Sequence, residues 1–197
     1  MKLRNSGWGM AVVATTGILL LAGCESAPIV NAEATGRSVD SETIEEVLPV
    51  GSPECLAAVE ALVAILVVAE ASSDSFSSTL RTAATGPASG FREVGTLSYA
   101  AAADQASAAN AYRAVAPLSV ESFALLAADA AYALDMSAAG LNNFAAASAA
   151  YGERETNLTT MELNRTASAA VDAPTEAAAA VQDATDESVS RGGNVCQ

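Results

Sequence analysis

Alanine sets the strongest limit on what this chain can fold into. The sequence contains 47 alanines among 197 residues, and aromatic residues make up only 5% of it. Alanine has the highest helix propensity and the smallest side chain able to pack in a core. No stretch of the chain has the pattern of a strand. We therefore expect an all-α fold whose thin core lies between closely approaching helices.

The N-terminal segment has the layout of a secretory signal. Lys2 and Arg4 precede an apolar run over 10–21, and Ala22 and Gly23 follow it. A basic start, a short apolar stretch and small residues are typical of a signal that is removed. The apolar run is too short for a permanent membrane span. Residues 1–23 are therefore predicted to be a signal peptide.

The residue after this signal is a cysteine. Leu21-Ala22-Gly23-Cys24 resembles the lipobox of bacterial lipoproteins. The resemblance implies that Cys24 receives a diacylglyceryl group on its sulfur and becomes an acylated N-terminus, with palmitate among its chains. It also implies attachment to the cell membrane, on the extracytoplasmic side, through this covalent lipid. The alternative is an ordinary secretory signal in which Cys24 has no role.

Charge and composition narrow the classes of function. The formal net charge is −14, and the chain has no histidine. Such an acidic chain should be repelled by nucleic acid and by anionic lipid surfaces. The lack of histidine removes the usual general base and the commonest nitrogen ligand for metals. We expect no enzyme activity, no cofactor and no metal site.

Two regions should follow the signal. Residues 24–52 are rich in acidic residues, Ser, Thr, Pro and Gly and have little apolar periodicity, which predicts a disordered tether. A flexible coil of this length spans roughly 30 Å. Residues 53–197 form the Ala-rich helical domain, predicted to be an antiparallel four-helix bundle.

The first helix should begin at Ser52-Pro53-Glu54, since serine caps helices and proline suits their first turn. It is predicted over 55–71, and its spacing allows continuation to Ala84. Apolar residues cover nearly its whole circumference, which predicts a central position in the bundle. The alternative is a second membrane segment, but the uninterrupted apolar run over 61–69 is too short to span.

Three more helical stretches follow. A second helix is predicted over 91–115, and a third over 120–151, capped by Ser119 with Leu118 packing on Phe123. A fourth is predicted from near Glu153, interrupted at 172–174, with a last piece over 175–189. The third stretch carries a heptad-like seam that predicts long antiparallel packing: Val120, Phe123, Ala127, Ala130, Leu134, Ser137, Leu141, Phe144, Ser148 and Tyr151.

Cys55 and Cys196 remain after Cys24. Export favours a disulfide between them, and two free thiols are the alternative. Cys55 starts the first helix and Cys196 follows the last one. In an up-and-down bundle these ends meet only if the number of helices is even. The disulfide therefore predicts four helices rather than three.

One short motif lies near the end of the third helix. Tyr151 precedes Glu155 by four residues, after a long Ala-rich stretch. Residues 119–165 resemble the helical-hairpin substrates of type VII secretion, in which a Tyr-x-x-x-acid motif follows the second helix. The turn at Pro117 lacks the Trp-x-Gly of that family, and a lipobox directs a different export route. The other interpretation is that Tyr151 anchors a helix end.

The remaining polar groups predict no chemistry. Asp183, Asp186 and Glu187 lack the tight Gly-containing loop that usually converges oxygens on calcium. We therefore expect a cell-envelope lipoprotein that acts as a protein-interaction or structural module, with an envelope protein as its partner. The alternative is a carrier that binds a small apolar or lipid ligand inside the bundle.

The lipobox interpretation has a direct test. Replacing Cys24 with alanine removes the sulfur that would carry the lipid, so the chain should stay uncleaved or become soluble. Membrane fractionation and gel mobility of the parent and the C24A chain measure this. A C24A chain that still fractionates as a processed membrane protein contradicts the interpretation.

Overall fold

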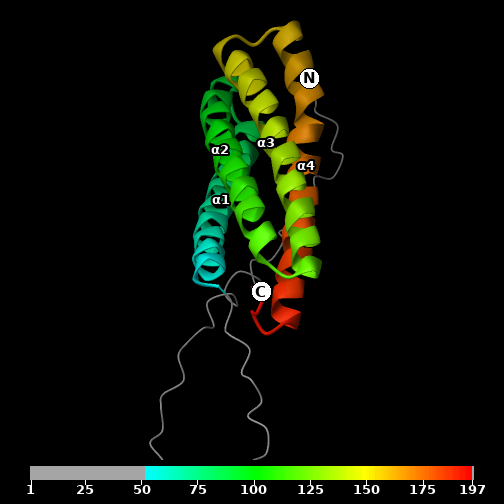
Figure 1. The fold of residues 1–197 in the computed structure, drawn as a ribbon. Helices are drawn as coiled ribbons and strands as arrows, with labels where there is room; N and C mark the ends of the chain where they lie inside the picture. The colour runs from blue at the N-terminus through cyan, green and yellow to red at the C-terminus, as the bar shows by residue number, and fades with distance from the viewer. Residues whose placement is uncertain (1–51, 197) are drawn as a thin grey trace, which may run out of the picture.

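The computed structural model describes residues 52–196, which form an all-α bundle (Figure 1). The predicted signal peptide, Cys24 and nearly all of the predicted tether lie outside these residues. Short connections, two of them including 3₁₀ turns, join four long helices that run up and down. Their bounds are α1 Pro53–Thr85, α2 Phe91–Val115, α3 Glu121–Glu153 and α4 Asn157–Ser190, with 3₁₀ turns η2 at Ala88–Gly90 and η3 at Ala116–Leu118.

Local sequence signals account for both ends of α1. The hydroxyl of Ser52 accepts a hydrogen bond from the Cys55 amide at 3.2 Å, and Pro53 occupies the first turn. The helix continues through its Ser-rich part to Thr85, as the apolar spacing predicted, and Gly86 lies in extended backbone. The predicted start is therefore confirmed, and the helix has the longer of the two extents that the sequence allowed.

The seam predicted along α3 is confirmed. Eight of its ten positions, from Phe123 to Ser148, are buried, and Val120 and Tyr151 at the two ends are half-buried. The helix packs against α2 on one side and α4 on the other. This two-sided contact makes α3, and not the first helix, one of the two central elements of the bundle.

The central position predicted for the first helix is wrong. Within residues 52–196, the α1 backbone packs closely against α2 but not against α3 or α4. Side chains fill the remaining distance, among them Phe76, whose ring meets that of Phe144 edge-on at 6.0 Å between centroids. Apolar residues surround α1 on nearly all sides, but only one side of the helix is buried.

Two glycines of α3 lie where this helix closely approaches its neighbours. A Cβ atom on Gly140 would lie 2.8 Å from the carbonyl oxygen of Ala169 on α4, and one on Gly152 would lie 2.6 Å from the amide nitrogen of Arg92 on α2. Real Cβ contacts are longer than this, so both backbones need glycine there. The two positions are close-approach points along one continuous helix.

The interruption predicted at 172–174 is also wrong, because α4 runs unbroken through Pro174. Proline removes one backbone hydrogen bond and clashes with the preceding turn, which costs about 3 kcal/mol in an isolated helix. Ala170 and Ala177 flank Pro174 and are both buried in the core. Packing on either side of the proline thus offsets its local cost.

Two helix starts differ from prediction. Val120, and not Ser119, precedes α3, and the Ser119 hydroxyl instead donates to the carbonyl of Ala116 at 2.9 Å. The fourth helix begins at Asn157 rather than near Glu153, because Thr156 and Thr159 form a reciprocal capping box there. In each case a local hydrogen bond, and not apolar spacing, decides the boundary.

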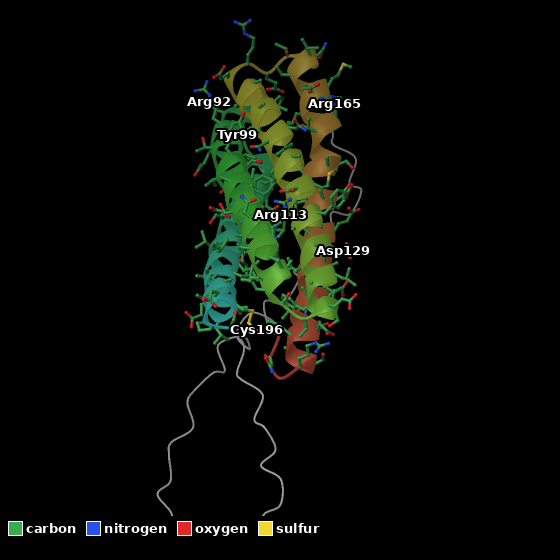
Figure 2. All side chains as sticks on the ribbon, in the orientation of Figure 1. Arg92, Tyr99, Arg113, Asp129, Arg165 and Cys196 are labelled. Atoms are coloured by element: carbon green, nitrogen blue, oxygen red, sulfur yellow. A yellow bond between two sulfur atoms is a disulfide. The ribbon has the colours of Figure 1, made fainter. Side chains whose placement is uncertain are left out.

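A disulfide joins Cys55 to Cys196, with 5.8 Å between the Cα atoms. It links the first turn of α1 to the segment that follows α4 at the same end of the bundle (Figure 2). The disulfide confirms the predicted pairing of the two cysteines, and the four helices confirm the predicted even number of helices. Closing a loop of this length stabilises the fold by about 5 kcal/mol in the chain-entropy model.

The close approach at Gly140 predicts the sign of a substitution. Glycine to alanine inside a helix usually stabilises by about 0.5 to 1 kcal/mol. Gly140→Ala should instead lower the free energy of unfolding by about 1 to 3 kcal/mol, because α3 and α4 must separate. Urea denaturation followed by circular dichroism measures this.

Gly86→Ala is the matched control for this substitution. Its Cβ would meet nothing nearer than 3.4 Å. Stabilisation by G140A, or an equal loss in G86A, would contradict close packing at Gly140.

Candidate interaction surface

One side of α1 is apolar and uncovered by the rest of residues 52–196. Val67 is 50% exposed and Val68 is 53% exposed. We call the surface they belong to the α1 face, defined by the exposed residues Leu56, Ala57, Ala61, Ala64, Val67, Val68 and Ala71. At helical spacing these residues share one side of the first five turns. Beyond them the same side becomes polar at Ser75 and Ser78.

The peripheral position of α1 explains why this face remains open, because its backbone packs closely against α2 and not against α3 or α4. Leu62, Leu66, Phe76 and Leu80 form the buried side of α1. These side chains fill the space between the α1 backbone and the α3 and α4 helices. By contrast, α3 and α4 approach each other closely through glycine and alanine at Gly140 and Ala169. The helix therefore covers the core with one side only and leaves the other to solvent.

Among residues 52–196, two helices are long and apolar enough to cross a membrane, judged by length and composition alone: α1 and α3. In α3, 44% of the most apolar 18-residue stretch is buried in the bundle, against 22% in α1. The helix with the most apolar sequence is thus the less covered of the two. Contiguous apolar surface of this kind marks sites of association.

Three acids occupy the Leu56–Val67 side of the α1 face, and we call them the acidic edge. Glu60 lies among the apolar residues, one turn from Leu56 and from Ala64, and Glu70 and Asp74 lie one turn apart at the border of the face. Partial burial and, to a smaller extent, the neighbouring Asp74 carboxylate raise the pKa of Glu70. Residues 53–80 contain no lysine or arginine. The face therefore combines an apolar surface with uncompensated negative charge.

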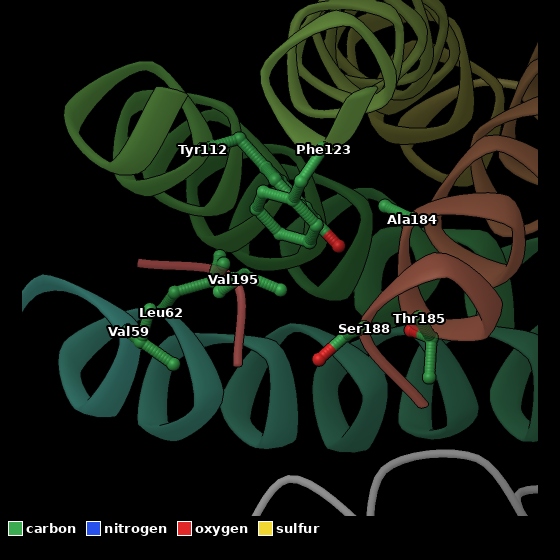
Figure 3. A pocket seen from close by; sticks show the side chains of 8 residues that line it. All are labelled: Val59, Leu62, Tyr112, Phe123, Ala184, Thr185, Ser188 and Val195. Atoms are coloured by element: carbon green, nitrogen blue, oxygen red, sulfur yellow. The ribbon is translucent and has the colours of Figure 1, made fainter. Parts of the chain in front are cut away.

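A small cavity lies on the inner side of α1 (Figure 3). Its volume is about 10 Å³, and Val59 and Leu62 of α1, Tyr112 of α2 and Ser188 of α4 are among the residues that line it. Burial raises the pKa of Tyr112, and the buried Ser188 hydroxyl has no hydrogen-bond partner. This volume is about that of one water molecule and far below that of a lipid chain.

The Tyr151 motif lies where α3 ends beside the start of α2. The rings of Tyr151 and Phe91 meet edge-on at 5.2 Å between centroids, and Arg92 donates through Nε to the carbonyl of Gly152 at 3.0 Å. A hydrogen bond to Glu155 and the negative charge of this residue add to burial in raising the pKa of Tyr151. The structure thus brings Tyr151 and Glu155 together, and these contacts fit the helix-anchor interpretation.

The predicted acidic group on α4 is dispersed. The Glu187 carboxylate accepts hydrogen bonds from the Ser122 hydroxyl on α3 at 2.6 Å and from Arg191 Nε at 2.5 Å. Asp186 instead accepts a hydrogen bond from the Gln182 amide at 2.7 Å. Over residues 52–196, no three Asp, Glu or Cys side chains gather in a way that could hold a metal ion. These acids act as helix and interhelix contacts.

A second exposed apolar stripe lies on α3. Leu125, Tyr132 and Met136 are exposed on its outer side, near Asp129 and close to the Arg113–Asp135 ion pair between α2 and α3 (Figure 2). Single apolar side chains among charges are normal on protein surfaces. The α1 face differs because seven exposed apolar residues share it and its charges, Glu60 among them, are all negative.

Sequence reasoning did not find the α1 face. Its residues were predicted to be buried, because periodicity alone cannot separate a helix covered on all sides from one covered on half of its surface. One signal was available in the sequence. The side of the helix that is apolar from Ala57 to Ala71 becomes polar at Ser75 and Ser78, and a helix covered on all sides has no reason to show this change.

Comparison of the chain with protein families, with curated proteins and with solved structures finds no match. The candidate site therefore depends on the geometry and chemistry of this chain alone.

The acidic edge predicts how stability depends on pH. Because the pKa of Glu70 is raised in the folded state, its ionised form disfavours folding, and the penalty disappears as pH falls through that pKa. Glu70→Gln should raise the free energy of unfolding at pH 7. Its advantage over the parent should shrink towards pH 4. Urea titrations at both pH values measure this.

Asp129→Asn, an exposed acid on α3, is the control (Figure 2). If E70Q is no more stable than D129N at pH 7, or if its advantage grows as pH falls, the assigned cause is wrong.

Proposed function

We propose that this chain is a protein-interaction module of the cell envelope. A lipid on Cys24 holds it at the extracytoplasmic side of the cell membrane, and the α1 face binds a partner protein. The observation that carries the proposal is the exposure of this face on the most apolar helix of the bundle. The proposal assigns no catalytic residue and no cofactor.

Burial energetics support a bound state for this helix. Each Å² of apolar surface removed from water contributes about 25 cal/mol. Covering Val67, Val68 and the neighbouring alanines therefore favours association, as long as the partner supplies a surface of matching shape. The acidic tether sequence and the lipid would restrict the domain to a layer close to the membrane, where a membrane protein partner meets it at high local concentration.

The carrier alternative receives less support. A ligand-binding bundle needs an apolar cavity of several hundred Å³. The cavity between α1, α2 and α4 is about 10 Å³. Binding a lipid there would require α1 to move away from the core, and the disulfide fixes the end of α1 that borders the cavity.

Site-specific photo-crosslinking tests the interaction module. A photoreactive phenylalanine analogue at Val68 of the full chain, expressed in its own host and irradiated in intact cells, should yield one discrete adduct with another polypeptide. The same analogue at Ala179, an exposed residue of α4, is the matched control. Adducts are separated by gel and sized by mass spectrometry.

Four results decide between the possibilities. An adduct at position 68 that is absent at position 179 supports the proposed surface. No adduct at position 68, or the same adducts at both positions, contradicts it. Covalent transfer of the label to a lipid at position 68 would also contradict a protein partner.

A further inference from the structure

The α1 face also indicates what kind of partner it fits, and this inference rests on the proposed function. We propose that the face binds one amphipathic helix of a partner protein, which carries lysine or arginine beside its apolar stripe. The shape of the face indicates a helix, and its charge indicates basic flanks.

The shape follows from the spacing of small exposed residues. Ala57, Ala61, Ala64, Val68 and Ala71 are spaced alternately by four and three residues, and all are exposed. A repeat of this kind forms a straight seam along a helix and accepts the side chains of a second helix packed lengthwise. Four alanines let the two backbones approach closely, as the alanines and glycines between α3 and α4 do in the core.

The length of the apolar seam limits the length of the partner helix. From 57 to 71 the seam extends about 21 Å at 1.5 Å per residue. Ser75 and Ser78 continue the spacing with polar side chains, so the apolar contact ends after Ala71. The complementary stripe is therefore two heptads, or about four turns, long.

The charge of the face selects the flanks of the partner. Glu60, Glu70 and Asp74 line one edge, and the first basic residue of α1 is Arg81, beyond the apolar seam. Partial burial of these carboxylates by a neutral or acidic partner would raise their free energy. Lysine or arginine along the partner helix would compensate them and would speed encounter with this acidic protein.

The same charges disfavour a second copy of this chain. An antiparallel pair of α1 helices brings the acidic flank of one copy alongside the acidic flank of the other. A parallel pair brings the acidic flank to the opposite flank, which carries Glu54, and in both cases residues 53–80 offer no basic residue to compensate the acids. Like charges at facing positions destabilise such pairs.

A bilayer surface is also a poor occupant. Interfacial helices combine basic polar faces with Trp, Phe or Leu on the apolar side. The α1 face has one leucine, no aromatic residue and an acidic edge. Negative lipids would repel it, and its alanines contribute little to insertion.

Three synthetic peptides of 22 residues test the inference. The first has leucine and alanine on a heptad seam with lysine at the flanking positions. The second replaces every lysine with glutamate, and the third has the composition of the first in a scrambled order without a stripe. The full chain is reconstituted in phosphatidylcholine nanodiscs, and fluorescence anisotropy measures peptide binding after subtraction of empty discs.

We expect the striped lysine peptide to bind and the other two to bind at least about tenfold more weakly. The double variant V67Q/V68Q should weaken binding of the striped lysine peptide about tenfold, because two apolar contacts are lost. The matched pair L125Q/M136Q, on the exposed stripe of α3, should leave the affinity within about twofold.

A second pair of variants tests the acidic edge. E60Q/D74N should weaken binding of the striped lysine peptide and reduce its dependence on salt, since fewer charge pairs are screened. The control D129N/D183N removes two exposed acids from α3 and α4. Its net charge equals that of E60Q/D74N, so the two variants differ only in where the charges are lost. Melting curves by circular dichroism verify that each variant is folded.

Several outcomes overturn the inference. Equal binding of the scrambled peptide, or equal losses in D129N/D183N and E60Q/D74N, would mean attraction to overall charge and no specific face. Preference for the glutamate peptide would reverse the proposed chemistry. A dimer in light scattering that V67Q/V68Q dissolves would identify a second copy as the occupant. Loss of nanodisc association in V67Q/V68Q C24A, relative to C24A alone, would identify the bilayer.

Failure here is separable from failure of the proposed function. If the peptide does not bind but the analogue at position 68 captures one protein in cells, the interaction module stands and its partner chemistry is different. If neither occurs, both proposals fail.

Discussion

Close contact between small side chains is the constraint on which the rest of this structure depends. The α2, α3 and α4 helices touch through alanine, serine and glycine, and at Gly140 and Gly152 even one methyl group would not fit. Larger side chains such as Tyr112 and Phe144 are buried between these close-approach points. The α1 backbone packs closely against α2 and not against α3 or α4, so this helix, which is rich in Val, Ile and Leu, keeps an apolar outer side.

The distribution of polar groups follows from the same constraint. The hydroxyls of Ser137 and Ser148 are buried without a hydrogen-bond partner in the residues that the structure describes, and both positions are fully buried on α3. Serine costs little volume there. By contrast, Ser98 donates to the carbonyl of Leu141 at 2.8 Å and ties α2 to α3. At Ser137 and Ser148, small size and not hydrogen bonding accounts for the residue in the seam.

Sequence reasoning predicted features that depend on short range or on simple topology. The cap at Ser52 and the heptad seam of α3 follow from local spacing, and the Cys55–Cys196 pair follows from the chain ends of a bundle with an even number of helices. The continuity of α4 through Pro174 could not be predicted, because it depends on packing of distant residues. The α1 face was missed for a related reason. Burial depends on how many neighbours a helix has, and periodicity does not report that number.

The disulfide also decides how a mechanical load would travel through the protein. Residue 52 precedes Cys55 by three positions, so a pull from the N-terminal side reaches the cross-link almost at once. A partner held on the α1 face would take up that load within the next five turns of α1. Tension between a membrane anchor and a partner would then pass along the first half of one helix, and the closely packed α2, α3 and α4 helices would carry almost none of it.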